Sequence, residues 1–145
     1  MKTESVSLEQ VTTFERLQPQ LEALCEELKE LSKKKADAAI SKFKVKLINE
    51  KLELANSLLG GEFKPFKDFD VLDIDAVPTT SDAVIVLSQY LESLETWRSS
   101  RISYERETIG GNWYWCITDE RVSVKTHAPK RAQVEEVESD EDEEE

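Results

Sequence analysis

The sequence predicts an α+β fold that is mainly α: an antiparallel, coiled-coil-like helical hairpin, a third helix, a small C-terminal antiparallel β-meander or hairpin, and a disordered acidic tail. Three observations support this prediction. Apolar residues recur at steps of three and four through most of residues 7–98, which is the heptad spacing of packed helices. From residue 101 they alternate instead, as in strands. Residues 132–145 carry nine acidic and no basic side chains, a composition that cannot form a core.

Length and composition limit the class of protein. A chain of 145 residues is short for two ordinary domains, so we expect residues 1–131 to form one small domain ahead of the tail. No apolar run approaches the ~20 residues of a membrane span, and the first residues lack the basic and apolar segments of a secretory signal. We therefore expect no membrane partner, a cytoplasmic location, and free thiols at Cys25 and Cys116.

The first helix is predicted to begin at a capping box formed by Ser7 and Gln10. Pro19 lies inside the helix and predicts a bend, because proline removes one backbone hydrogen bond. A heptad seam follows the cap and does not break at the proline. Its members are Phe14, Leu17, Leu21, Leu24, Leu28 and Leu31.

A second apolar seam begins after a change of register at residues 32–37, which indicates a turn or a stutter. This seam consists of Ile40, Phe43, Leu47 and Leu54, with Val45, Ile48, Leu52 and Ala55 beside it, and it ends at Gly60-Gly61. Residues 7–59 therefore form either a hairpin or one long kinked helix. The first arm is acidic and the second is rich in lysine, and this opposition of charge favours the hairpin.

Residues 60–79 form a connector that contains three phenylalanines and is expected to pack against the helices. The third helix, residues 80–98, carries Val84, Leu87, Leu91, Leu94 and Trp97 at heptad-like spacing. Residues 101–127 then read as a three-stranded meander in which residues 113–117 form the most buried strand. The alternative extends the third helix to Glu107 and leaves a single hairpin.

The sequence offers no constellation for catalysis, so we expect no enzymatic activity, no cofactor and no metal. His127 is the only histidine and lies next to the acidic tail, where we expect a solvated imidazole. The alternating aspartates at residues 68–75 lack the glycine and the final glutamate of a calcium loop. The glycine doublets do not match a phosphate-binding loop and serve as turns.

These observations predict an acidic interaction protein, acting as an adaptor, inhibitor or assembly chaperone, that binds a protein partner or a second copy of itself through its helical seams. Unburied seam surface would also make it oligomeric. The expected partner-binding residues are Phe14, Leu17, Leu21, Leu24, Leu28, Leu31, Ile40, Phe43 and Leu47.

The alternative is a protein that binds single-stranded nucleic acid through the net positive C-terminal region, with the acidic tail as its inhibitor, because aromatic rings between cations stack on unpaired bases. A further alternative is an acidic mimic of DNA, which the chain resembles in charge and tail alone. The nucleic-acid alternative would use Arg98, Arg101, Arg106, Trp113, Trp115, Arg121 and Lys125.

Overall fold

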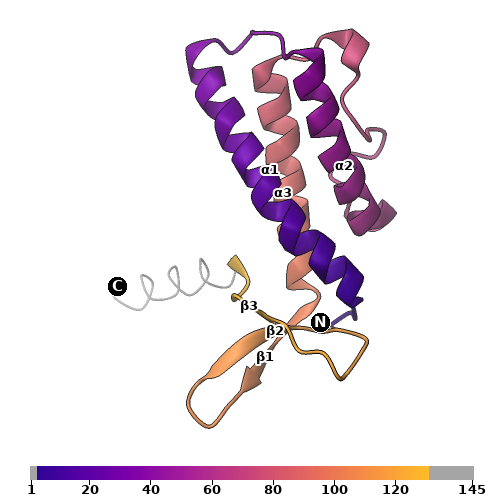
Figure 1. Ribbon diagram of the computed structural model, residues 1–145, viewed down its shortest axis with the longest axis vertical. Helices are drawn as coiled ribbons and strands as arrows, with labels where there is room; N and C mark the ends of the chain where they lie inside the picture. The colour runs from indigo at the N-terminus through magenta and orange to yellow at the C-terminus, as the bar shows by residue number, and fades with distance from the viewer. Residues whose placement is uncertain (1–2, 131–145) are drawn as a thin grey trace, which may run out of the picture. The chain divides into compact units, whose positions relative to one another are not determined.

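The computed structural model describes residues 3–130, so the predicted acidic tail at residues 132–145 lies outside the described residues (Figure 1). The order of elements confirms a mainly helical α+β protein with a hairpin, a third helix and a small antiparallel sheet. The elements are α1 (Leu8–Lys34), α2 (Lys42–Phe63), the 3-10 turn η1 (Ile74–Ala76), α3 (Thr80–Ser99), β1 (Ile102–Arg106), β2 (Gly111–Trp115) and β3 (Lys125–Thr126).

The described chain divides into two compact units. A helical unit comprises residues 12–94, and a β unit comprises residues 3–11 together with residues 95–130. The first residues of α1 and the last residues of α3 belong to the β unit, and the remainder of both helices belongs to the helical unit. That residues 1–131 form one domain stays a prediction.

Residues 7–59 form a hairpin and not one long helix, because a turn separates α1 from α2. Ala39 in this turn forms an antiparallel bridge with Thr79, just before α3. The Thr80 N–H donates to the Ala38 carbonyl at 2.9 Å, and the Ile40 N–H donates to the Pro78 carbonyl at 3.0 Å. In the helical unit α2 and α3 therefore begin at the same end and run antiparallel to α1, as Figure 1 shows.

The core of the helical unit corrects the predicted seam of α2. Phe43, Leu47 and Leu54 are exposed, whereas the residues expected beside the seam form the buried face of the helix. Both sets have heptad-like spacing, and at 100° per residue they lie about 130° apart around the helix. Packing against the other helices therefore selects one stripe. The buried residues of α2 are Val45, Ile48, Leu52, Ala55, Leu58 and Leu59.

The predicted end of α2 at Gly60 is marked by a break in the helix. Gly60 has φ 64° and ψ −175°, and a final turn extends the element to Phe63. A positive φ is the backbone region that glycine adopts without a steric penalty. The connector then returns the chain to the end at which α3 begins.

Two asparagines of α2 bind this connector, which confirms that it packs against the helices. The Asn49 side chain donates to the Leu72 carbonyl and accepts from the Leu72 N–H, both at 2.9 Å. One heptad later the Asn56 side chain donates to the Asp70 carbonyl at 2.8 Å and accepts from the Tyr90 hydroxyl at 2.6 Å. These two polar side chains of α2 therefore hold the return segment in place.

The β unit contains the predicted meander, and the alternative of a longer third helix is wrong. The strands lie in the order β1-β2-β3 with antiparallel pairing throughout. The middle strand lies at residues 111–115 and not at the predicted residues 113–117. Only Trp115 of β2 is buried and the rest of the strand is half-buried, so the strand is less enclosed than expected. The ring of Trp115 lies 5.9 Å from that of Trp97, which α3 supplies.

The N-terminal segment adds a pairing that the sequence pattern did not reveal. Val6 pairs in parallel with Ile117, and its N–H donates to the Cys116 carbonyl at 2.8 Å. The predicted capping box follows directly, since the Gln10 N–H donates to the Ser7 hydroxyl at 3.1 Å and the Ser7 N–H donates to the Gln10 side chain at 3.0 Å.

Replacing Asn49 with alanine should lower the free energy of unfolding by about 1–3 kcal/mol, because the part-buried N–H and carbonyl of Leu72 lose their partner. Urea denaturation followed by circular dichroism measures this change. The control is Glu50→Ala, at the next and exposed position of α2, which should change stability little. Equal losses in the two variants would contradict the prediction.

Candidate functional site

An apolar groove lies between α1 and α2 in the helical unit. Its cavity has a volume of about 150 Å³. Phe43 is 70% exposed and Leu47 is 37% exposed, so the wall that α2 contributes is open to solvent. The lining residues are Leu24, Glu27 and Leu28 from α1, with Phe43, Lys44, Leu47 and Ile48 from α2.

The groove follows from how each helix uses its apolar residues. On α1 the buried positions after Leu21 are Cys25 and Leu28, which leaves Leu24 at the edge of the buried stripe. On α2 the core takes Val45 and Ile48. Phe43 and Leu47 lie one helical turn apart on a second stripe that the core does not use. The hairpin therefore presents apolar side chains along one edge.

A second cavity, which we call the basic pocket, lies at the end of the hairpin where α2 and α3 begin. Its volume is about 340 Å³. Three lysines line it together with aliphatic residues and two hydroxyls. It shares Leu28 and Lys44 with the groove, so the two cavities are neighbours. The lining residues are Leu28, Leu31, Lys34, Lys35, Ala38, Ala39, Ile40, Ser41, Lys44 and Thr80.

The structure brings together six of the nine predicted partner-binding residues. Leu24, Leu28, Phe43 and Leu47 line the groove, and Leu28, Leu31 and Ile40 line the basic pocket. The other three are fully buried in the core, at most 1% exposed, so their role is packing and the prediction is corrected for them: Phe14, Leu17 and Leu21.

Sequence reasoning missed the lysines and Ile48 as lining residues. The signal for the lysines was present, since they cluster on both sides of the predicted turn at residues 33–35 and 42–46. Ile48 was placed beside the seam of α2, and it is buried while also forming the inner wall of the groove.

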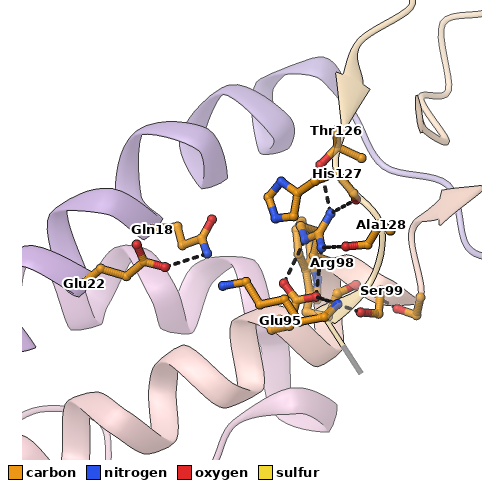
Figure 2. A network of polar contacts seen from close by, with 11 residues as sticks. Gln18, Glu22, Glu95, Arg98, Ser99, Thr126, His127 and Ala128 are labelled. Carbon is orange, nitrogen blue, oxygen red and sulfur yellow. Dashed lines mark hydrogen bonds and ion pairs between the residues drawn. The ribbon is translucent and has the colours of Figure 1, made fainter. Parts of the chain in front are cut away.

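Within the β unit, the structure buries two of the seven residues expected to contact nucleic acid. Trp115 is 4% exposed and Arg98 is 0% exposed. Trp115 completes the packing against Trp97. Arg98 is held inside a network of hydrogen bonds that leaves its guanidinium group no open donor (Figure 2). Both residues are therefore removed from the predicted nucleic-acid surface.

The Arg98 guanidinium uses all five of its N–H donors. It binds the Glu95 carboxylate in a bidentate pair, with Nε–Oε1 at 2.8 Å and Nη2–Oε2 at 2.9 Å. Nη1 donates to the Thr126 hydroxyl and to the His127 carbonyl, both at 2.8 Å. Nη2 also donates to the Ala128 carbonyl at 3.1 Å. Arg98 thus fastens residues 126–128 to the last turn of α3.

The Glu95 carboxylate completes this network. Burial by itself would raise the pKa of Glu95, but the hydrogen bonds and charge of Arg98 outweigh it and lower the pKa below its ordinary value. The Lys130 N–H, at 3.3 Å from Oε2, and the Ser99 hydroxyl, at 3.1 Å, lower the pKa further. The carboxylate therefore stays ionised at neutral pH and neutralises the buried guanidinium.

The remaining members of the basic region do not form a single surface. Arg101 is half-buried, pairs with Glu4 at 2.8 Å and lies over the ring of Trp97 at 4.6 Å. Trp113 packs against Tyr104 with ring centroids 5.7 Å apart. Lys125 is opposite Tyr114 in the register of the sheet, so strand alternation sends it to the face opposite Trp113. Arg106 and Arg121 are exposed, and Arg121 pairs with Asp119 at 3.1 Å.

Across residues 3–130, no group of three histidine, cysteine or carboxylate side chains is arranged to hold a metal ion. His127 is exposed, as expected, and its carbonyl accepts from Arg98. None of the helices in this range is long and apolar enough to cross a membrane.

Comparisons with protein-family models, curated proteins and solved structures found no match.

Replacing Arg98 with methionine should lower the free energy of unfolding by about 3–5 kcal/mol, because the substitution leaves a part-buried carboxylate without its partner. Urea denaturation measures the loss. The control is Arg121→Met, which removes an exposed ion pair and should cost about 0–1 kcal/mol. If the two variants are equally stable, Arg98 is not the anchor of residues 126–128.

The lowered pKa of Glu95 predicts a pH dependence of stability. The contribution of the ion pair is fully present above the ordinary pKa of a glutamate, about 4.3, and is lost as the pH falls through the lower pKa of the folded state. The stability difference between the wild type and Glu95→Gln should therefore be large at neutral pH and should shrink below about pH 4. Melting temperatures recorded across this range test the prediction.

Glu120→Gln, at an exposed position of the β unit, is the control for the pH experiment. Its stability should follow that of the wild type at every pH. A difference for Glu95→Gln that stays constant down to pH 3 would show that Glu95 contributes by packing and not by charge.

Proposed function

We propose that this protein is a non-enzymatic interaction protein that binds a protein partner through the groove between α1 and α2. The observation that carries the proposal is the exposure of Phe43, 70% of whose surface is open to solvent beside an apolar cavity. Burying a phenylalanine or leucine side chain contributes about 1.5–3 kcal/mol. A partner that covers Phe43 and Leu47 would gain this free energy.

The form of the groove indicates how a partner would bind. It follows two antiparallel helices, and its lining is aliphatic and aromatic except for Glu27 and Lys44. Such a groove suits one face of an amphipathic helix, whose side chains at every third or fourth position enter it. Phe43 would then be the anchor at the centre of the interface. Adaptor, inhibitor and assembly-chaperone roles all agree with this mode of binding.

A second copy of the chain is the alternative partner for the same surface. Phe43, Leu47 and Leu54 lie on one stripe of α2 and are all exposed, and two such stripes could pack together as in a coiled coil. A partner protein is the simpler proposal, because the stripe is narrow and Lys46, Glu50 and Lys51 flank it. A cytoplasmic location and the absence of a cofactor belong to the same proposal.

Nucleic-acid binding is less well supported, because Arg98 and Trp115 are buried. The feature that still favours it is the pair formed by Tyr104, which is 50% exposed, and the half-buried Trp113. Mimicry of DNA is disfavoured by the lysines of α2, which interrupt the negative charge of the helical unit.

Replacing Phe43 with aspartate should abolish capture of the protein partner and leave the fold intact, because the side chain contributes to the groove and not to the core. Affinity capture from cell lysate, with and without nuclease, compares what the wild type and the variant retain. A protein retained by the wild type after nuclease treatment and lost from Phe43→Asp is the expected result.

The matched control is Ile85→Asp on α3, at an apolar side chain that is 60% exposed but does not line the groove. This variant should retain the same protein as the wild type. Identical capture by all three chains would contradict the proposal. Sedimentation at micromolar concentrations identifies a second copy: an assembly that Phe43→Asp dissociates would make the chain its own partner.

A further inference from the structure

The basic pocket is a cavity of about 340 Å³ that adjoins the groove and has a different lining. Its lining combines the aliphatic residues Leu28, Leu31 and Ile40 with three lysines, Lys34, Lys35 and Lys44. Such a combination suits a ligand that carries both apolar and negatively charged groups, since aliphatic side chains exclude water while lysines attract negative charge.

The charge around the pocket is opposite to that of the whole chain, whose net charge is −12. Asp37 is the only acidic residue among residues 31–46. Cationic side chains are therefore concentrated where α1 ends and α2 begins. The lysines of this segment are Lys33, Lys34, Lys35, Lys42, Lys44 and Lys46.

Two of the pocket lysines have no carboxylate partner within residues 3–130. The other lysines of α1 pair along the helix, Lys29 with Glu26 at 3.4 Å and Lys33 with Glu30 at 3.0 Å. Lys44 reaches Glu27 only at the limiting distance of 4.0 Å. Lys34 and Lys35 are exposed and form no ion pair with the described residues, so their charges are available to a ligand.

The position of Lys42 and Lys44 is unfavourable for the helix that carries them. The first turn of α2 contains no acidic residue, although the N-terminus of a helix is its positive end and favours negative charge. The cap of α2 does not use the lysine side chains, because it is formed by the Ser41 hydroxyl, which accepts from the backbone N–H of Lys44 at 3.2 Å. By contrast α3 begins with Asp82 in its first turn. The stability of the helix therefore does not account for the lysines at the start of α2.

We infer that the partner segment is an acidic amphipathic helix. Its apolar side chains would cover Phe43 and Leu47 in the groove, and its carboxylates would reach the lysines of the adjoining basic pocket. This inference rests on the proposed function and specifies the chemistry of the partner. Leu28 and Lys44 line both cavities, so a single helix can bind both.

The lining favours a peptide over a nucleic acid. Nucleic-acid surfaces combine arginine contacts to phosphate with aromatic rings for stacking. The groove and the pocket together contain one aromatic residue, Phe43, no arginine and several aliphatic side chains. Aliphatic side chains do not stack on bases, but they do pack against the leucines of an amphipathic helix.

The lysine charges of the basic pocket should affect binding of the helix differently from the apolar contacts of the groove. Exposed pairs between lysine and carboxylate are individually weak and are screened by salt, so they orient the helix and accelerate its association. Contacts with Phe43 should persist at high salt, because apolar burial does not depend on screening. Salt concentration therefore separates the two contributions.

Fluorescence anisotropy with the full-length chain and two synthetic helical peptides tests the inference. Both peptides carry leucines at every third or fourth position. One has glutamates beside them, and the other has lysines. The acidic peptide should bind at low salt and weaken as salt rises, and the basic peptide should bind at least about tenfold more weakly. Equal binding of the two peptides would overturn the inference.

The pocket variant is the triple substitution Lys34→Gln, Lys35→Gln and Lys44→Gln. Its matched control, Lys67→Gln, Lys125→Gln and Lys130→Gln, removes the same charge at lysines that line neither the groove nor the pocket. The pocket variant should bind the acidic peptide about tenfold more weakly and with less salt dependence, and the control should stay within about twofold of the wild type. Equal weakening in both triples would overturn the inference.

Phe43→Asp separates this inference from the proposed function. If it abolishes binding of both peptides while the two triples behave alike, the groove binds helices without preference for charge, and only the inference fails. If Phe43→Asp binds the acidic peptide as the wild type does, the groove itself is not the site.

The pair Lys34→Glu and Lys35→Glu, at exposed side chains without ion pairs to the described residues, replaces the pocket triple if that triple variant unfolds. Displacement of the acidic peptide by a single-stranded oligonucleotide would also overturn the inference.

Discussion

The backbone pairing between the turn after α1 and the segment before α3 is the constraint on which the helical unit depends. Ala38 and Ile40 bind Thr80 and Pro78 through their main chains, and the Thr80 hydroxyl donates to the Lys35 and Ala36 carbonyls at 3.0 Å. Because this pairing places the starts of α2 and α3 at one end, the connector must run the full length of the bundle. The asparagines of α2 hold the returning connector. The end of the helical unit at which α2 and α3 begin contains the basic pocket.

The groove and the core result from the same distribution of apolar residues on α2. A helix in a three-helix unit needs one apolar stripe, and α2 has two. The stripe of Val45, Ile48 and Leu52 is buried, and the stripe of Phe43 and Leu47 faces solvent. An exposed apolar stripe disfavours solubility, and the proposed partner would relieve this cost. The lysines and glutamates between its members keep the uncovered stripe hydrated.

The buried arginine of the β unit and the exposed lysines of the helical unit have different roles. In the β unit the buried Arg98 meets a complete set of acceptors, and Glu95 neutralises its charge, so it holds a segment of chain. In the helical unit Lys34 and Lys35 find no acidic partner among the described residues and face solvent. The burial of a cationic side chain and the number of its partners therefore show whether it is structural or available for binding. Residue type and net charge do not show this.

The sequence alone determined the local features of this protein. The three helices, the short meander, the Ser7 cap and the break at Gly60 follow from periodicity and backbone chemistry, which act between residues close in sequence. Only the tertiary structure decided which stripe of α2 is buried, that Val6 pairs with Ile117, and that Arg98 lies inside the β unit. Each of these depends on residues far apart in the chain, and both stripes of α2 satisfy the same helical period. Four of the predicted seam residues line the groove. The lysines line the basic pocket because the closed hairpin brings the end of α1 and the start of α2 together.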